Sequence, residues 1–100
     1  MPANTRSDNR TMSITHAEFQ RSLKPLKHYY QVTVGDTGKR VEISDQELRV
    51  VVQLGSEKAV NLGSLTMPST QVEFTFRYAD DHEMVLFWSR FDLCFRRGGG

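Results

Sequence analysis

The sequence predicts an α+β fold, in which an antiparallel sheet of three to five strands follows a short helix and precedes a longer one. Residues 71–78 alternate between apolar and polar side chains, which is typical of a strand with one buried face. Residues 84–95 carry apolar side chains at the three-and-four spacing of a single helix face. The connections between the predicted strands are too short for parallel crossovers, so we expect a meander.

Length and composition indicate one globular domain. The chain has 100 residues, of which 38% are hydrophobic and 25% are charged. Thirteen Lys and Arg against twelve Asp and Glu give a net charge of +1. Proteins that bind nucleic acid are usually basic with clustered charge, so we expect nucleic acid to be an unlikely partner. The same balance gives no support for binding to a membrane surface.

Cysteine content and hydropathy favour a cytoplasmic location. Cys94 is the only cysteine, so no disulfide forms within the chain. The N-terminal residues lack the apolar segment of a signal peptide. The longest apolar runs, residues 50–52 and 84–88, are far shorter than the ~20 residues of a membrane helix.

The N-terminal residues 1–12 are polar and have no periodicity, and we expect a disordered leader. Whether Met1 or Met12 is the native start is open. A single domain over residues 13–97 and a flexible glycine tail, residues 98–100, complete the predicted organisation.

The first helix is predicted by Thr15 and Glu18, which have the spacing of a capping box. It should end near Lys24, because Pro25 disfavours helical angles in the residue before it. Strands are expected over residues 28–34, 39–43 and 47–54, with turns at residues 35–38, 44–46 and 55–58. Residues 59–68 are open between an irregular edge strand and a loop, because Gly63 and Pro68 interrupt them.

The second helix should begin after Asp80, a typical N-cap, and end before Gly98, a typical C′ residue. Both predicted helices have one apolar face, so we expect them to cover the same side of the sheet. The apolar face of the second helix comprises Met84, Phe87, Trp88, Phe91, Cys94 and Phe95.

No group of residues predicts catalysis, a metal or a cofactor, so we expect a protein that is not an enzyme. His82 and Glu83 resemble the start of a zinc-protease helix, but Leu86 stands where the second histidine is required. Asp80 and Asp81 are explained as capping groups. Cys94 lies near a helix C-terminus, where the dipole disfavours a thiolate.

Apolar side chains outside the main helix face predict a partner-binding surface. Val85, Leu86 and Leu93 lie off the apolar face. A helix that is apolar on more than one side must be packed against other structure on more than one side. Together with Arg96 and Arg97 they predict binding of another protein, or of a second copy in a homodimer. The function that the sequence favours is therefore that of a small cytoplasmic binding or assembly-accessory protein.

Two alternatives remain. The terminal residues Arg96-Arg97-Gly98-Gly99-Gly100 resemble, over five residues, the ends of ubiquitin and of sulfur-carrier proteins. That resemblance implies a carrier whose C-terminal glycine is activated or conjugated. The second alternative is weak binding of single-stranded nucleic acid by an open sheet face with an outward Tyr29, although the outward strand residues are not aromatic. Its basic patch would comprise Arg77, Arg90, Arg96 and Arg97 together with Lys39, Arg40 and Arg49.

Overall fold

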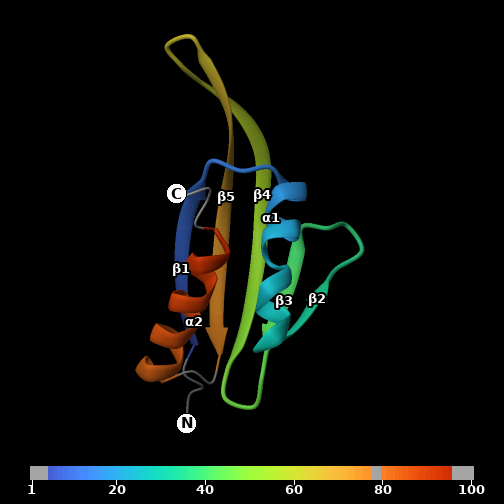
Figure 1. Ribbon diagram of the computed structural model, residues 1–100, viewed down its shortest axis with the longest axis vertical. Helices are drawn as coiled ribbons and strands as arrows, with labels where there is room; N and C mark the ends of the chain where they lie inside the picture. Colours follow the sequence, from blue (N-terminus) through green and yellow to red (C-terminus); the bar gives the residue numbers. More distant parts are fainter. Residues whose placement is uncertain (1–4, 78–79, 96–100) are drawn as a thin grey trace.

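The computed structural model describes residues 5–77 and 80–95, and it shows a five-stranded antiparallel sheet with both α-helices on one face (Figure 1). The predicted α+β class is confirmed. The elements in chain order are β1 (Thr5–Met12), α1 (His16–Ser22), the 3-10 helix η1 (Lys24–His28), β2 (Gln31–Val34), β3 (Arg40–Ser44), β4 (Arg49–Leu62), β5 (Leu65–Arg77) and α2 (Asp81–Cys94).

The strands lie in the order β1-β5-β4-β3-β2. Strands β2 to β5 form the predicted meander, because each one pairs with the next in the chain. Strand β1 then pairs with the outer edge of β5, with Thr5 opposite Arg77 and Met12 opposite Thr70. The N-terminal segment therefore completes the sheet beside the last strand.

The expectation of a disordered leader over residues 1–12 is wrong for residues 5–12, which form strand β1. It is polar because α2, rather than a hydrophobic core, covers its inner side. The Arg10 guanidinium carbon lies 3.8 Å from the centre of the Trp88 ring, and Arg10 Nη1 lies 2.9 Å from Asp92 Oδ1. Arg6 forms a similar ion pair with Asp81. Charged side chains thus take the place of an apolar alternation. Residues 1–4 lie outside the described residues.

Helix α1 begins at the predicted capping box, which is confirmed. Glu18 N donates to Thr15 Oγ1 at 3.1 Å, and Thr15 N donates to Glu18 Oε1 at 3.0 Å. The helix ends at Ser22, close to the expected end, but the chain then continues as η1 with Pro25 in its first turn. Strand β2 consequently starts at Gln31, not at His28.

Aromatic side chains join the two helices to the sheet. The Phe19 ring of α1 lies 6.1 Å from Phe91 of α2 and 5.2 Å from the following Phe95. Phe91 meets Phe74 of β5 edge to face at 5.2 Å. Val72, Phe74 and Phe76 are fully buried, as their alternation predicts; Tyr78 lies outside the described residues. Both helices therefore cover the same face of the sheet, as expected.

Strands β4 and β5 are much longer than predicted. The expected turn at residues 55–58 lies inside β4, where Gly55 and Ser56 form a bulge opposite Gln71. A Cβ on Gly55 would lie 3.2 Å from the Gln71 carbonyl oxygen, so glycine suits this close approach. The chain reverses instead at Gly63 and Ser64, and the φ of +62° at Gly63 is typical of tight hairpin turns.

Candidate functional site

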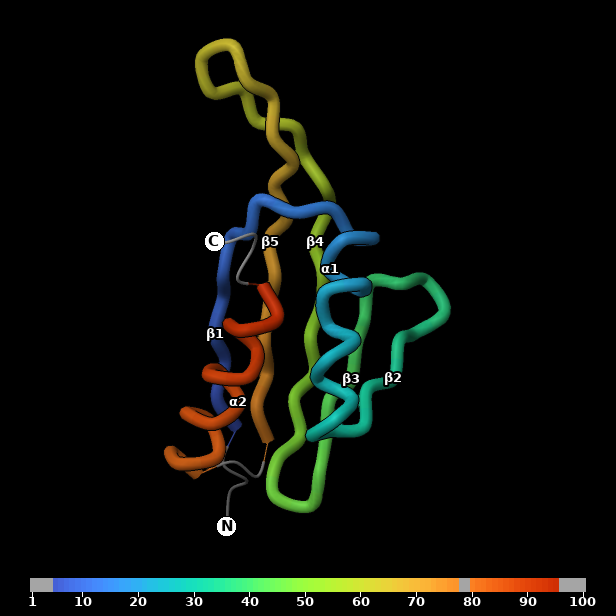
Figure 2. The backbone as a smooth tube through the Cα atoms, viewed as in Figure 1, coloured from blue at the N-terminus to red at the C-terminus, as the bar shows by residue number. Residues whose placement is uncertain are grey.

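The hairpin formed by β4 and β5 projects beyond the rest of the molecule. Residues 58–69, which we call the arm, pair with one another and with no other strand of the described chain. Strand β3 reaches only to Gln53 of β4, and β1 reaches only to Thr70 of β5. The arm is therefore a two-stranded ribbon that extends past the helices (Figure 2), and the molecule measures 51 Å along its longest axis.

One side of the arm is apolar and exposed. Val60 lies opposite Met67, and Leu62 lies opposite Leu65, so these four side chains share a single side of the ribbon. The exposed fractions are 39% for Val60, 56% for Leu62 and 63% for Leu65. We call these four residues the apolar face of the arm. An exposed cluster of large apolar side chains is typical of an interaction surface.

The bulge at Gly55 and Ser56 places the apolar side chains of both strands on the same side. In an unbroken strand, Val60 and Leu62 would share a side with Leu54, which is buried in the core. The extra residue in β4 moves them to the opposite side, where Leu65 and Met67 of β5 lie. The apolar face therefore points away from the side of the sheet that the helices cover.

Beyond Lys58 at its base, the arm lacks the charges that normally protect exposed strand edges. No charged residue occurs between Lys58 and Glu73. In the part of β5 that belongs to the arm, Pro68 is the one protective residue. Leu62 and Leu65 flank the two-residue turn and form a hydrogen-bonded pair. Because such pairs alternate along the ribbon with pairs that lack these bonds, Ala59 and Pro68, three pairs further on, form a pair without them. Proline thus removes a donor from the outer edge of β5, but the β4 edge and the apolar face stay open.

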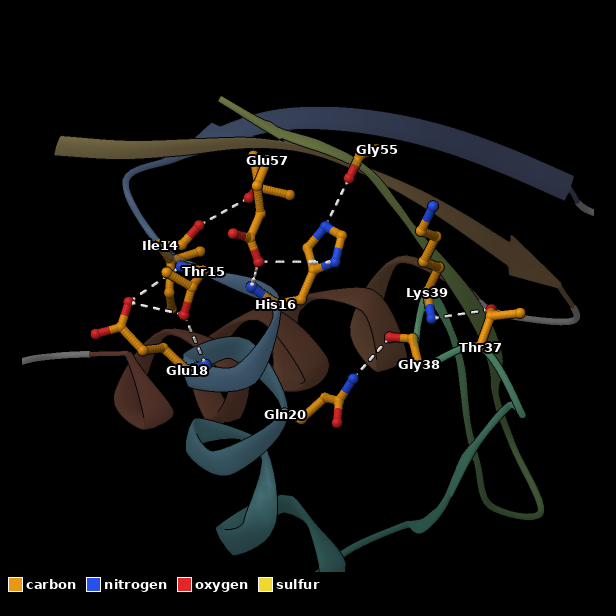
Figure 3. A network of polar contacts seen from close by, with 11 residues as sticks. Ile14, Thr15, His16, Glu18, Gln20, Thr37, Gly38, Lys39, Gly55 and Glu57 are labelled. Atoms are coloured by element: carbon orange, nitrogen blue, oxygen red, sulfur yellow. Dashed lines mark hydrogen bonds and ion pairs between the residues drawn. The ribbon is translucent and has the colours of Figure 1, made fainter. Parts of the chain in front are cut away.

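Contacts with the N-terminus of α1 hold the base of the arm (Figure 3). His16 Nε2 lies 2.7 Å from Gly55 O, and it must carry the proton because a carbonyl only accepts. The His16 backbone N donates to Glu57 Oε1, also at 2.7 Å. Opposite Glu57, on β5, the buried Thr70 hydroxyl donates to Ile14 O at 2.7 Å. These bonds fix the direction in which the arm leaves the body.

The structure separates the residues that the sequence proposed for partner binding. Val85 and Leu93 are exposed on α2, at 64% and 60%, but Leu86 is half-buried. Val85 and Leu93 are about 12 Å apart along the helix axis, and Ser89 lies between them. They do not form a continuous patch. The other proposed residues, Arg96, Arg97, Gly98, Gly99 and Gly100, lie outside the described residues.

The residues considered for catalysis or metal binding have structural roles or lie apart. Asp80 caps α2 by accepting from Glu83 N at 2.9 Å. Burial raises the pKa of the Cys94 thiol, although a hydrogen bond with the Leu26 backbone opposes the shift. Within residues 5–77 and 80–95, no group of three or more His, Cys, Asp or Glu is placed to hold a metal ion.

The cations considered for nucleic-acid binding are dispersed or paired. Arg40 and Arg49 contact Glu42 at 3.1 and 2.7 Å on the sheet face that the helices leave open. These bonds, with that from Arg40 first, hold the pKa of the Glu42 carboxyl below its ordinary value of 4.5. Arg90 lies elsewhere, 4.2 Å from the centre of the Tyr29 ring. Arg77 lies opposite Arg49 in the sheet, and both are exposed on the open face. Because Glu42 lies between Arg40 and Arg49, these described cations form a mixed cluster and not a continuous basic stripe.

Comparison of the chain with protein-family models and with curated proteins gave no match. No helix in the described part of the chain is both long and apolar enough to cross a membrane. The arm is the described feature that contributes least to the core of the fold, and it is therefore the leading candidate for a functional element.

Proposed function

We propose that this chain is a non-catalytic protein-binding module and that the arm is its principal binding element. The observation that carries the proposal is the apolar face of the arm, which projects from the body and has no charged residue beyond Lys58 at its base. Leu62 and Leu65, at the tip, are more than half exposed. A partner that covered them would remove a large apolar area from water, the main favourable term in protein association.

The construction of the arm supports the same proposal. A two-stranded ribbon is only marginally stable alone in water. This one is nevertheless held at its base by His16 and Thr70, which give it a defined direction. A binding element that is already positioned loses less conformational entropy on association. The partner of the arm is therefore an apolar surface on a separate protein.

The exposed Val85 and Leu93 of α2 make a smaller contribution to partner binding than the arm does. Both side chains are as exposed as those at the tip of the arm. Because Ser89 separates them, they provide two isolated contacts and not a patch. Substitutions on the arm should therefore weaken binding more than substitutions on α2.

The test is a selection of binding peptides from a displayed random library, with the full chain immobilised. Selected peptides should carry apolar residues, and their affinity should fall about tenfold for the double variant Leu62→Ser with Leu65→Ser. The matched control, Ala59→Ser with Thr66→Ser, changes the opposite side of the same arm and should leave affinity unchanged. Val85→Ser with Leu93→Ser measures the contribution of α2.

Two outcomes would overturn this proposal. Peptides that bind both arm variants as well as the unsubstituted chain would exclude the apolar face as the binding element. Sedimentation analysis tests the other point, namely the choice of a separate partner. A concentration-dependent dimer that disappears in the Leu62→Ser, Leu65→Ser variant would replace that partner by a second copy of the chain.

A further inference from the structure

A second surface with recognition chemistry lies between the first helical segment and the edge of the sheet. A groove of about 370 Å³ runs between α1 with η1 on one side and β2 on the other. Its apolar lining includes the buried Leu23, the half-buried Val32 and the exposed Val34. The Gln20 side chain lines the same groove and donates to Gly38 O at 2.7 Å (Figure 3), which ties the β2–β3 turn to α1.

The rim of the groove is positively charged. Arg21, Lys24 and Lys27 line it, follow one another at intervals of three residues and are all exposed. None of the three side chains makes a hydrogen bond or ion pair within residues 5–77 and 80–95. No acidic residue lines the groove. An acidic ligand would therefore meet three cations that have no competing partner in the described chain.

The backbone of β2 is also open to a ligand. Strand β2 is the last in the sheet order, so one of its edges has no neighbouring strand. Gly35 N donates to Arg40 O at 2.7 Å and continues the β2–β3 register. Because bonded and non-bonded pairs alternate, Val32 and Val34 direct their N–H and C=O groups away from β3. These four groups can pair with an added strand.

We propose that β2 and this groove bind an extended acidic segment of another protein, which adds to the sheet as a sixth strand. Strand addition uses backbone bonds for affinity and alternate side chains for specificity. Every second residue of the added strand would face the groove. A central apolar side chain would pack on Leu23, Val32 and Val34. Acidic residues two positions to either side would then reach the rim formed by Arg21, Lys24 and Lys27.

The probe is a nine-residue synthetic peptide with valine at its centre and glutamate two residues to either side. Its binding to the full chain is measured by fluorescence anisotropy at two salt concentrations. Binding should weaken as salt rises, because exposed charge pairs are screened. Charge reversal by Lys24→Glu with Lys27→Glu should lower affinity about tenfold or more. The matched control, Lys39→Glu, reverses a cation outside the groove lining and should have little effect.

A second variant tests the strand addition separately from the charge. Val34→Pro removes an N–H that faces the free edge of β2 and leaves the β2–β3 bonds intact. We expect the same loss of peptide affinity. The substitutions Leu62→Ser and Leu65→Ser on the arm should not change it, so this site and the arm are tested independently.

Four results would overturn the inference. The first is no binding at millimolar peptide, and the second is equal binding of a peptide with glutamine in place of glutamate. The third is binding that Val34→Pro leaves unchanged, because the peptide would then not extend the sheet. The fourth is binding of the chain to phosphatidylserine vesicles, with loss in the Lys24→Glu, Lys27→Glu variant, in the absence of peptide binding. That last result would assign the basic rim to a membrane surface.

Discussion

At the scale of single residues, Glu42 has the best-defined ion pairs on the open sheet face. It lies between Arg40 and Arg49 and accepts hydrogen bonds from both guanidinium groups, at 3.1 and 2.7 Å for the closest atoms. Since the side chain is 34% exposed, solvent screens these pairs and limits their contribution to stability. Their effect should be visible mainly in the dependence of stability on pH.

The variant Glu42→Gln tests this dependence. The pKa of Glu42 is lowered in the folded state, so its stabilisation is present above the unfolded-state pKa of about 4.5. That stabilisation is lost as pH falls through the folded-state pKa. We expect Glu42→Gln to lower the free energy of unfolding by about 0.5 kcal/mol at pH 7 and to flatten the decline below pH ~4.5.

Urea titrations from pH 7 to pH 3 measure this difference. The control is Glu47→Gln, because the Glu47 side chain makes no hydrogen bond or ion pair within the described residues. Parallel pH profiles for the unsubstituted chain and Glu42→Gln would contradict the assignment of the effect to Glu42.

At the scale of elements, the arm depends on its turn as well as on the contacts at its base. Gly63 has a φ of +62°, and a Cβ at this position would meet no atom within 4 Å. The cost of a side chain there is therefore conformational. Left-handed angles cost a residue other than glycine roughly 1–2 kcal/mol.

We expect Gly63→Ala to loosen the arm without unfolding the domain. Protection of amides between Val60 and Met67 against hydrogen exchange should fall about tenfold, the factor that corresponds to ~1.4 kcal/mol. The midpoint of global unfolding should hardly change, because the arm lies outside the core. Ser64→Ala is the matched control and should retain the protection. A lower global midpoint with unchanged arm protection would show instead that the arm opens only with the core.

The sequence predicted those elements that bury apolar side chains. Phe74 and Phe76 alternate in β5, and Phe87 and Phe91 recur along α2, so both elements were recognised. Strand β1 was missed because Arg10 and its neighbours form charged contacts with α2, which leave no hydrophobic period.

The candidate site was missed for a different reason. Val60, Leu62, Leu65 and Met67 alternate symmetrically about Gly63 and Ser64, which is a hairpin pattern. Gly55 conceals this pattern, because a glycine between two apolar runs resembles a turn more than a bulge. The β2 groove combines residues from separate elements, so no short stretch of sequence indicates it.

At the scale of the whole molecule, β1 joins the start of the chain to its last strand and helix. Its pairing covers the β5 edge from Thr70 to Arg77. Its Arg6 and Arg10 side chains bond Asp81 and Asp92 near the two ends of α2. The segment therefore stabilises the sheet edge and the helix together.

Deletion of residues 1–11 should destabilise the domain by more than ~2 kcal/mol. The cation–π contact and the two partly exposed ion pairs account for about 2 kcal/mol, and the lost pairing with β5 adds to it. The deletion also leaves the β5 edge unpaired, so we expect concentration-dependent self-association. Denaturant unfolding and sedimentation velocity measure the two effects. Arg10→Met keeps the strand and loses only its charged contacts, so it should reduce stability without promoting association. An equally stable monomer after the deletion would show that β1 contributes nothing.

The pairing of β1 with β5 also has a consequence for the newly synthesised chain. Thr5 is made long before Arg77, its partner across the sheet. The hairpins of the meander join neighbouring segments and can form as each emerges from the ribosome. Strand β1 cannot pair until β5, the last of the five strands in chain order, has been made. Until then β4 offers an open edge, and β5 later fills the place between β4 and β1.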